Sequence, residues 1–267
     1  RRHRNNGTHT LRLGRLLIVL AGTIILLVIA GIAIAGSSVL YGKHKYDQFV
    51  ADVVPPEELL STLPRGGARI YDRNGVLLYE FVDEFGGLRR PVPIANISEW
   101  VIKATIATED ASFYENNGLN SRGLARAGVE NFSPFGNSDF LEGSGGSSIT
   151  QQLAKNVYIP KEERAERSVE RKLKEAAIAL ELTKNYTKDQ ILEWYLNSIS
   201  YGGIYVGIEA AAEGYFGKRA GDLNLAEAAL LAGIPQSPAL YNPLSNFSVS
   251  KARQQEVLDL MVHHNQI

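Results

Sequence analysis

Two adjacent carboxylates, Glu109 and Asp110, stand inside the apolar, helix-like stretch "ATIATEDASFYENNG" at positions 104–118. Neighbouring helical residues point about 100° apart, so at most one of the two can line a pocket while the other caps or braces. A carboxylate among apolar neighbours can serve as a general base, because burial raises its pKa. A solvated helix end would show the same residues, and the pair alone leaves both interpretations open.

A second segment, "GGSSITQQLAKN" at positions 145–156, leads from glycines into a helix whose first turn carries hydroxyls and amides. The free N–H groups and the positive end of the dipole at such a helix start favour an anion. Lys155 adds a cation about two turns further on. A phosphate ligand fits this segment, and so does an ordinary capped helix.

The third segment is "ERSVERKLKEAAIALEL" at positions 166–182. Arg167, Arg171 and Glu175 follow one another at four-residue steps and therefore share one helix face. A surface ion ladder would contribute only tenths of a kcal/mol, and the order Arg before Glu is the less favourable one. Two arginines beside one carboxylate could equally clamp a diphosphate.

The elements that must position these side chains are mainly α-helical. From Ile94 onward, apolar residues recur at three- and four-residue intervals, which is typical of amphipathic helices. Ser148 precedes Gln151, and Thr187 precedes Gln190, at the spacing of a capping box. We therefore predict a mainly α domain, and we find no internal repeat.

The segment 37–93 has a mixed pattern and is interpreted as a stalk and a short β-hairpin region. Asn74 and Gly75 lie between two β-prone runs in "ARIYDRNGVLLYEF". This dipeptide suits a tight turn with positive φ, so we expect a hairpin there.

The run at positions 16–36 contains about 21 residues without a charge, enough to span about 30 Å of hydrocarbon. A cleaved signal peptide is the alternative, but its apolar core would be only about 7–15 residues long. Arginines precede the run, and positive charge holds that end of a span in the cytoplasm. We predict a cytoplasmic basic tail over 1–15, a single-pass transmembrane helix over 16–36, and an extracytoplasmic remainder.

Composition excludes several classes of protein. The formal net charge is −1, so nothing global indicates a nucleic-acid partner. Cysteine is absent, which excludes a disulfide framework and a thiolate metal site.

Taken in order, the segments resemble the peptidoglycan glycosyltransferase domain of class A penicillin-binding proteins and of monofunctional transglycosylases. The likeness covers positions 94–243 and rests on "EDASFYENNG", "GGSSITQQLAKN", "RKLKE", "KDQILEWYLN" and "GIEAAAEGYFGK". Two positions depart from the usual pattern of the family. Asn116 stands where the family usually has His, and Ser148 stands where it usually has Thr.

The resemblance implies a lysozyme-like, mainly α glycosyltransferase domain over 94–267, with a small lobe that dips into the membrane. The loop at 131–141, which contains Phe135 and Phe140, is the candidate for that membrane contact. The expected location is the bacterial cytoplasmic membrane. The expected partners are lipid II, the growing glycan strand, membrane lipids and cell-wall synthesis proteins.

The implied reaction polymerises lipid II into β-1,4 glycan strands with inversion and release of undecaprenyl diphosphate. By residue-wise match, Glu109 is the catalytic base and Glu175 the second catalytic carboxylate, which positions the diphosphate. A divalent cation, Mg²⁺ or Mn²⁺, is the candidate cofactor, with Glu175 as its candidate ligand. The substrate-binding set comprises Asp110, Phe113, Ser148, Gln152, Lys155, Asn156, Arg167 and Arg171. Within it, Asp110 is expected to brace the base.

Two other functions are considered. A module that binds lipid-linked precursors without turnover would not need the intact Glu109 and Glu175. A lysozyme-like glycan hydrolase would not need the cationic donors, because glycan cleavage releases no diphosphate.

Overall fold

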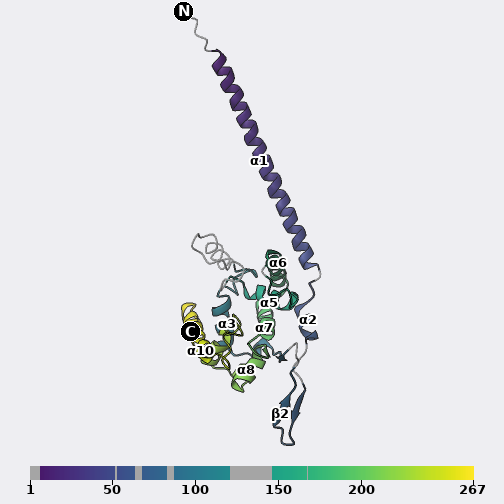
Figure 1. The fold of residues 1–267 in the computed structure, drawn as a ribbon, viewed down its shortest axis with the longest axis vertical. Helices are drawn as coiled ribbons and strands as arrows, with labels where there is room; N and C mark the ends of the chain where they lie inside the picture. Colours follow the sequence, from purple (N-terminus) through teal and green to yellow (C-terminus); the bar gives the residue numbers. More distant parts are fainter. Residues whose placement is uncertain (1–6, 52, 64–67, 83–86, 121–145, 167) are drawn as a thin grey trace, which may run out of the picture. The chain divides into compact units, whose positions relative to one another are not determined.

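The computed structural model describes residues 7–51, 53–63, 68–82, 87–120, 146–166 and 168–267 (Figure 1). The chain divides into two compact units, residues 1–51 and 52–267. The predicted membrane-contact loop with Phe135 and Phe140 lies outside the described residues, as does Arg167.

The first unit is a single long helix, α1 (Gly7–Val50). The part Ile25–Val50 is long and apolar enough to cross a membrane, and none of its residues is buried. The helix continues well past Gly36, so the first part of the predicted stalk is helical. An ion pair between Lys43 and Asp47, 2.7 Å apart and one turn from each other, lies on this continuation.

The second unit begins with a short helix, α2 (Pro56–Thr62), and the predicted hairpin. Strands β1 (Arg69–Tyr71) and β2 (Leu77–Glu80) pair antiparallel. Gly75 has a φ of +82°, and the Asp72 carboxylate accepts hydrogen bonds from the backbone of the same turn. The hairpin prediction is confirmed.

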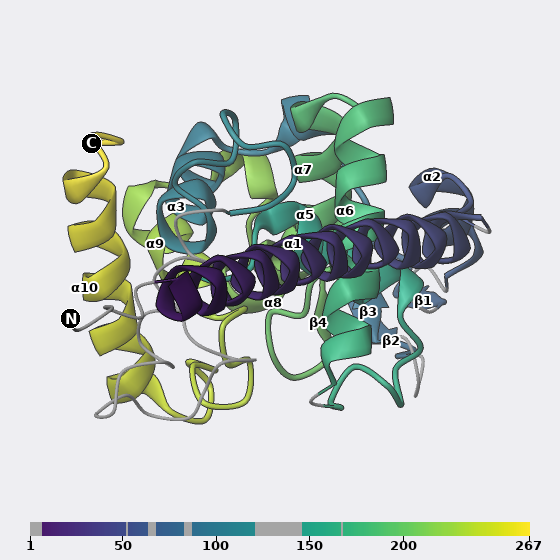
Figure 2. The same ribbon diagram turned by 90° about the horizontal axis from the view of Figure 1, so that it is seen from above.

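The rest of the unit is mainly helical, which confirms the predicted fold class. Helices α3, α9 and α10 contact one another, while α5 contacts both α6 and α7 (Figure 2). A single parallel pairing joins two short strands, β3 and β4. The bounds are η1 (Ile94–Asn96), α3 (Glu99–Glu109), α5 (Ile149–Tyr158), α6 (Val169–Asn185), α7 (Lys188–Ser198), α8 (Ile208–Phe216), η2 (Ala220–Asp222), α9 (Leu225–Gly233), α10 (Phe247–His263), β3 (Leu88–Arg89) and β4 (Tyr205–Val206).

Small side chains bring α3, α9 and α10 close together. Their contact is built largely from alanines, with Val257 and Met261 of α10 filling the space between them. Close packing of this kind leaves little freedom of movement. The carboxyl end of α3, which carries the paired acids, is therefore held firmly in place.

Both predicted capping boxes are present. Ser148 caps α5 and pairs reciprocally with Gln151, and Thr187 caps α7 in the same way with Gln190. The starts of both helices are thus fixed by local sequence.

Candidate active site

Glu109 is the last residue of α3, and its carboxylate is held from the neighbouring helix α5. Gln152 donates a hydrogen bond from Nε2 to Oε2 of Glu109 at 2.7 Å. The buried Tyr195 of α7 donates in turn from its hydroxyl to Oε1 of Gln152 at 3.1 Å. Three helices therefore fix the position of one carboxylate.

Burial raises the pKa of Glu109 above its ordinary value. The Gln152 hydrogen bond and the positive charge of Arg253 oppose this rise, whereas the negative charge of Asp110 adds to it. A carboxylate that gives up solvation but keeps one amide donor is a better proton acceptor than one in water. Glu109 thus has the environment of a general base.

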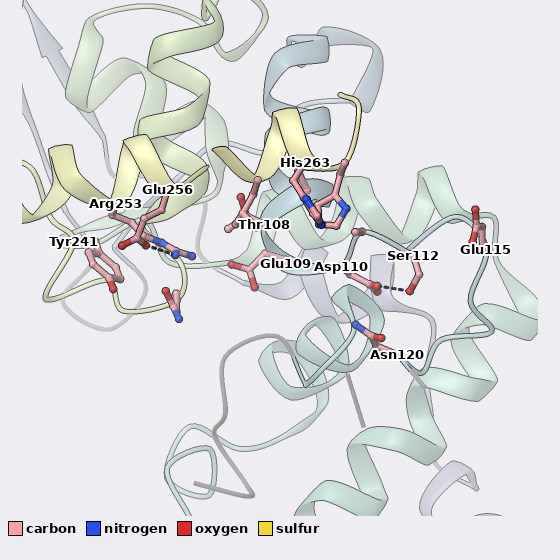
Figure 3. Close-up of a pocket in the computed structure, with 15 residues that line it drawn as sticks. Thr108, Glu109, Asp110, Ser112, Glu115, Asn120, Tyr241, Arg253, Glu256 and His263 are labelled. Carbon is pink, nitrogen blue, oxygen red and sulfur yellow. Dashed lines mark hydrogen bonds and ion pairs between the residues drawn. The ribbon is translucent and has the colours of Figure 1, made fainter. Parts of the chain in front are cut away.

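A cavity of about 680 Å³ opens at Glu109 (Figure 3). Its opposite side comes from α10 and the loop before it, where Arg253 lies against Glu256 at 2.8 Å and over the Tyr241 ring at 5.5 Å. The lining residues are Ala107, Thr108, Glu109, Asp110, Ala111, Ser112, Glu115, Asn120, Gln236, Tyr241, Arg253, Glu256, Leu260, His263 and His264.

The contributions of Gln236, Tyr241, Arg253 and Glu256 were not anticipated from the sequence. The sequence at positions 236–256 has no local pattern that distinguishes it from that of an ordinary loop followed by a surface helix. The packing of α10 against α3 brings Arg253 and Glu256 to the cavity, and the loop before α10 brings Gln236 and Tyr241.

Asp110, which directly follows the last residue of α3, also lines the cavity, so the expectation that at most one of the two acids could do so is wrong. Asp110 is nevertheless only 2% exposed. Its carboxylate accepts hydrogen bonds from the Ser112 hydroxyl, from Nδ2 of Asn116 at 2.8 Å, and from the backbone N–H of Ile149 at 3.3 Å. Asp110 therefore ties the end of α3 to the start of α5. The amide that holds Glu109 directly is that of Gln152.

Phe113 and Ser148 are both fully buried in this structure. The Phe113 ring packs edge-on against Tyr114. The Ser148 hydroxyl donates to the Gly118 carbonyl and accepts from the backbone N–H of Gln151 at 3.0 Å. The Ser148 hydroxyl thereby links the segments 104–118 and 145–156.

Lys155 and Asn156 lie on the last turns of α5 and are partly buried. They share their helix with Gln152, which contacts Glu109. The segment 145–156 therefore carries both the contact to Glu109, the predicted base, and the predicted donors to the substrate.

Glu175 lies one turn after Arg171 on α6 and is 1% exposed. Its Oε1 pairs with Nη1 of Arg171 at 2.5 Å. Its Oε2 lies 2.9 Å from Nζ of Lys172, an ion pair without hydrogen-bond alignment. Lys172 also donates to the Ser147 hydroxyl at 3.0 Å, so this lysine, which was not singled out from the sequence, links α6 to the segment before α5.

The structure thus gathers Glu109, Asp110 and Gln152 in one place, and Arg171 with Glu175 in another. Glu175 is not among the described residues that line the cavity at Glu109. The two catalytic carboxylates predicted from the sequence have separate surroundings.

The donor set around Glu175 does not fit a divalent cation. Both carboxylate oxygens face positively charged side chains, and hard cations prefer several oxygen ligands. Within the described part of the chain, no three His, Asp or Glu side chains gather at metal-binding distance. A metal requirement stays a prediction, to be measured as activity with and without a chelator.

Comparison with known proteins shows the family of the chain. The sequence model of the transglycosylase family matches residues 75–262, and the chain belongs to that family. It is 40% identical over 192 residues to penicillin-binding protein 2D of Bacillus subtilis, with 72% of the chain and 26% of the relative covered. It is 37% identical over 235 residues to penicillin-binding protein 1A of Escherichia coli, with 87% of the chain and 26% of the relative covered.

Among solved structures, the chain is similar to penicillin-binding protein 1A from Haemophilus influenzae. The match has 25% identity and a TM-score of 0.42, and it covers 77% of this chain and 19% of the other. The chain spans about a quarter of the length of the curated relatives named above. The apolar helix α1 and these relatives together indicate a membrane-anchored protein.

Proposed function

We propose that this chain is a peptidoglycan glycosyltransferase that polymerises lipid II into β-1,4 glycan strands, with inversion and release of undecaprenyl diphosphate. The observation that carries the proposal is the Glu109 carboxylate, which has a raised pKa, is held by Gln152 and opens on the cavity. A hydroxyl nucleophile needs a base of this kind.

In the proposed step, Glu109 takes the proton from the 4-hydroxyl of the acceptor sugar. The freed oxygen forms a bond to the anomeric carbon of the growing chain while the bond from that carbon to the diphosphate oxygen breaks. The leaving diphosphate carries away the electron pair. Negative charge thus builds on the diphosphate, and preorganised cations lower the barrier to its departure.

The cations for this role are on α5 and α6. Lys155 lies on α5, and Arg171 and Lys172 lie at the start of α6. Glu175 holds both cations of α6 through its ion pairs and thereby fixes their positions. In this proposal Glu175 acts on the donor diphosphate through the cations that it holds.

The lipid-linked substrate agrees with the apolar helix α1. We propose that this helix crosses the cytoplasmic membrane once, with the basic residues 1–15 in the cytoplasm and residues 94–267 outside. Lipid II, the growing strand and membrane lipids are then the direct partners, and other cell-wall synthesis proteins are further ones.

The test is to incubate the full chain, in detergent or in vesicles, with labelled lipid II and to look for polymer. We expect polymer from the native chain and loss of polymer from the Glu109→Gln variant. Bound but unpolymerised lipid II would contradict the proposal in favour of a binding module. Shortening of preformed glycan would contradict it in favour of a hydrolase.

A further inference from the structure

Asn116 lies between a carboxylate and an ammonium group and bonds to both. Its Nδ2 donates to Oδ2 of Asp110 at 2.8 Å. Its Oδ1 accepts from Nζ of Lys188 at 3.0 Å and from the backbone N–H of Gly118 at 2.9 Å. The Asn116 amide therefore donates to the Asp110 carboxylate and accepts from the Lys188 ammonium.

Each neighbour of Asn116 reaches a different part of the candidate active site. Asp110 directly follows Glu109 and accepts the backbone N–H of Ile149 at the start of α5. The Gly118 carbonyl accepts the Ser148 hydroxyl, which caps the same helix. The end of α3 and the start of α5 are thus joined through the segment that carries Asn116.

Lys188 brings α7 into the same unit. Its Nζ lies 4.6 Å from the centre of the Phe113 ring, a cation–π contact with a fully buried aromatic side chain. Burial lowers the pKa of Lys188, and the negative charge of Asp110 opposes this fall. Since the surroundings are partly desolvated, the hydrogen bond from the ammonium is stronger than it would be in water.

We propose that Asn116 and Lys188 are positioning residues for the transfer reaction. The Asn116 amide joins the ammonium of Lys188 to the carboxylate of Asp110, and so holds the end of α3, with the base Glu109, in register with the start of α5. This inference rests on the proposed function. It adds two residues that act through Asp110 and do not touch the substrate.

A histidine at position 116 provides a selective test of this arrangement. Neutral imidazole has one N–H donor and one nitrogen acceptor, so it can donate to Asp110 and accept from Lys188, although its single acceptor does not also serve the Gly118 N–H. Imidazolium has two donors, so it loses the acceptor that Lys188 requires and places a second positive charge beside it. The Asn116→His variant should therefore polymerise lipid II when the imidazole is neutral and lose this activity when the imidazole is protonated.

The charged groups on the described elements around position 116 decide where this histidine titrates. Asp110, at the end of α3, favours imidazolium, and Lys188 of α7 opposes it. Asp189 of α7 is bonded to the Tyr114 hydroxyl at 3.0 Å, and Glu115 is the chain neighbour. From α6, the groups nearest to Gly118 are the Ala179 carbonyl and the Thr183 hydroxyl, which carry no charge, and α5 presents the Ile149 N–H.

The experiment measures kcat and KM for lipid II polymerisation between pH 5.5 and 8.5, with the native chain and the Asn116→His variant. At pH 8, kcat of the variant should be within about twofold of the native value. At pH 5.5, about one unit below the ordinary pKa of His, kcat should be about tenfold below the native value at that pH, with KM little changed. Asn185→His, an exposed change on α6, is the matched control and should follow the native profile.

Lys188→Met is the second variant, because it keeps the apolar stem over Phe113 and removes the charged donor. Its kcat should fall about tenfold at every pH. The control Lys184→Met, at a side chain that is 72% exposed, should change kcat by less than about twofold.

Three outcomes would overturn the inference. A native pH profile for Asn116→His would show that the acceptor for Lys188 is not needed. A fall in kcat that tracks the melting temperature of the variant would show a role in stability alone. If the native chain makes no polymer in the same assay, the proposed function fails first and the inference fails with it.

Discussion

Glu109 and Glu175 are the same residue type in opposite surroundings. Glu109 is partly buried, is held by one neutral amide, and faces a cavity. Glu175 is fully buried, and two cations flank its carboxylate. The first environment keeps a proton acceptor available, while the second uses its charge to hold other charges in place.

The sequence alone shows two glutamates in helical segments and does not distinguish their roles. Their surroundings in the structure suggest a different role for each. A carboxylate that must accept a proton cannot also neutralise two cations at close range, since those cations would favour its ionised form. In the proposed function, these two tasks fall to α3 and α6. Four sets of substitutions test this contrast.

The largest effect is expected from Glu109→Gln compared with Asp110→Asn. Loss of the proposed base should lower kcat by about 10²–10⁴-fold, whereas loss of the Asp110 charge, which acts through hydrogen bonds, should lower it much less. Polymer formation from lipid II, followed over time, measures both. Equal losses would remove the distinction between the two acids.

The same Glu109 variant has a predictable effect on folding. The folded-state pKa of Glu109 is raised, so its contribution to stability is fully present below the unfolded pKa and is lost as pH rises through the folded pKa. Above that folded pKa, the native chain bears the unfavourable ionised form. Glu109→Gln should keep or raise the melting temperature at pH 7, which excludes unfolding as the cause of lost activity.

The second change is Glu175→Gln, which leaves Arg171 and Lys172 without their buried counter-charge. Breaking a buried ion pair from one side should lower the free energy of unfolding by about 3–5 kcal/mol. Urea unfolding measures this loss. The control Glu181→Gln, on the same helix and 3.7 Å from an exposed lysine, should lose less than about 1 kcal/mol.

The third change is Gln152→Ala, which removes the amide from Glu109. The hydrogen bond lowers the pKa of Glu109, so its loss should raise that pKa further. The acid limb of the profile of kcat/KM against pH should then move to higher pH. Gln255→Ala, an exposed change on α10, is the control, and an unmoved limb for Gln152→Ala would contradict the structure.

The smallest effect is expected from Arg253→Met. The positive charge of Arg253 also lowers the pKa of Glu109, but by less than the Gln152 hydrogen bond does. The acid limb should move in the same direction by a smaller amount. Arg219→Met, at a side chain that is 74% exposed, is the matched control and should leave the limb in place.

The parts of the fold that local chemistry determines were predictable from the sequence. The Asn74-Gly75 pair encoded the hairpin, and the capping boxes at Ser148 and Thr187 encoded two helix starts, because each depends on residues a few positions apart. The shared helix face of Arg171 and Glu175, on which their ion pair forms, also followed from four-residue spacing. Such features need no knowledge of tertiary packing.

The long-range contacts of the site were not predictable in this way. The Glu109–Gln152 hydrogen bond joins two helices, and the place of Arg253 at the cavity depends on how α10 packs against α3. The bridge through Asn116 to Lys188 likewise joins segments far apart in the chain. A single sequence does not contain the relative placement of its helices as a local pattern.

Tyr195 has one further consequence, for the direction of the Gln152 amide. The two ends of an amide have nearly the same shape but opposite polarity, so the side chain could flip without a change in packing. Burial and the charge of Glu109 raise the pKa of Tyr195 well above its ordinary value, so the phenol keeps its single proton and offers it to Oε1. The NH₂ end faces Glu109, whose carboxylate oxygen accepts from it, and the hydroxyl of Tyr195, which does not itself contact the carboxylate, stabilises this direction of the amide.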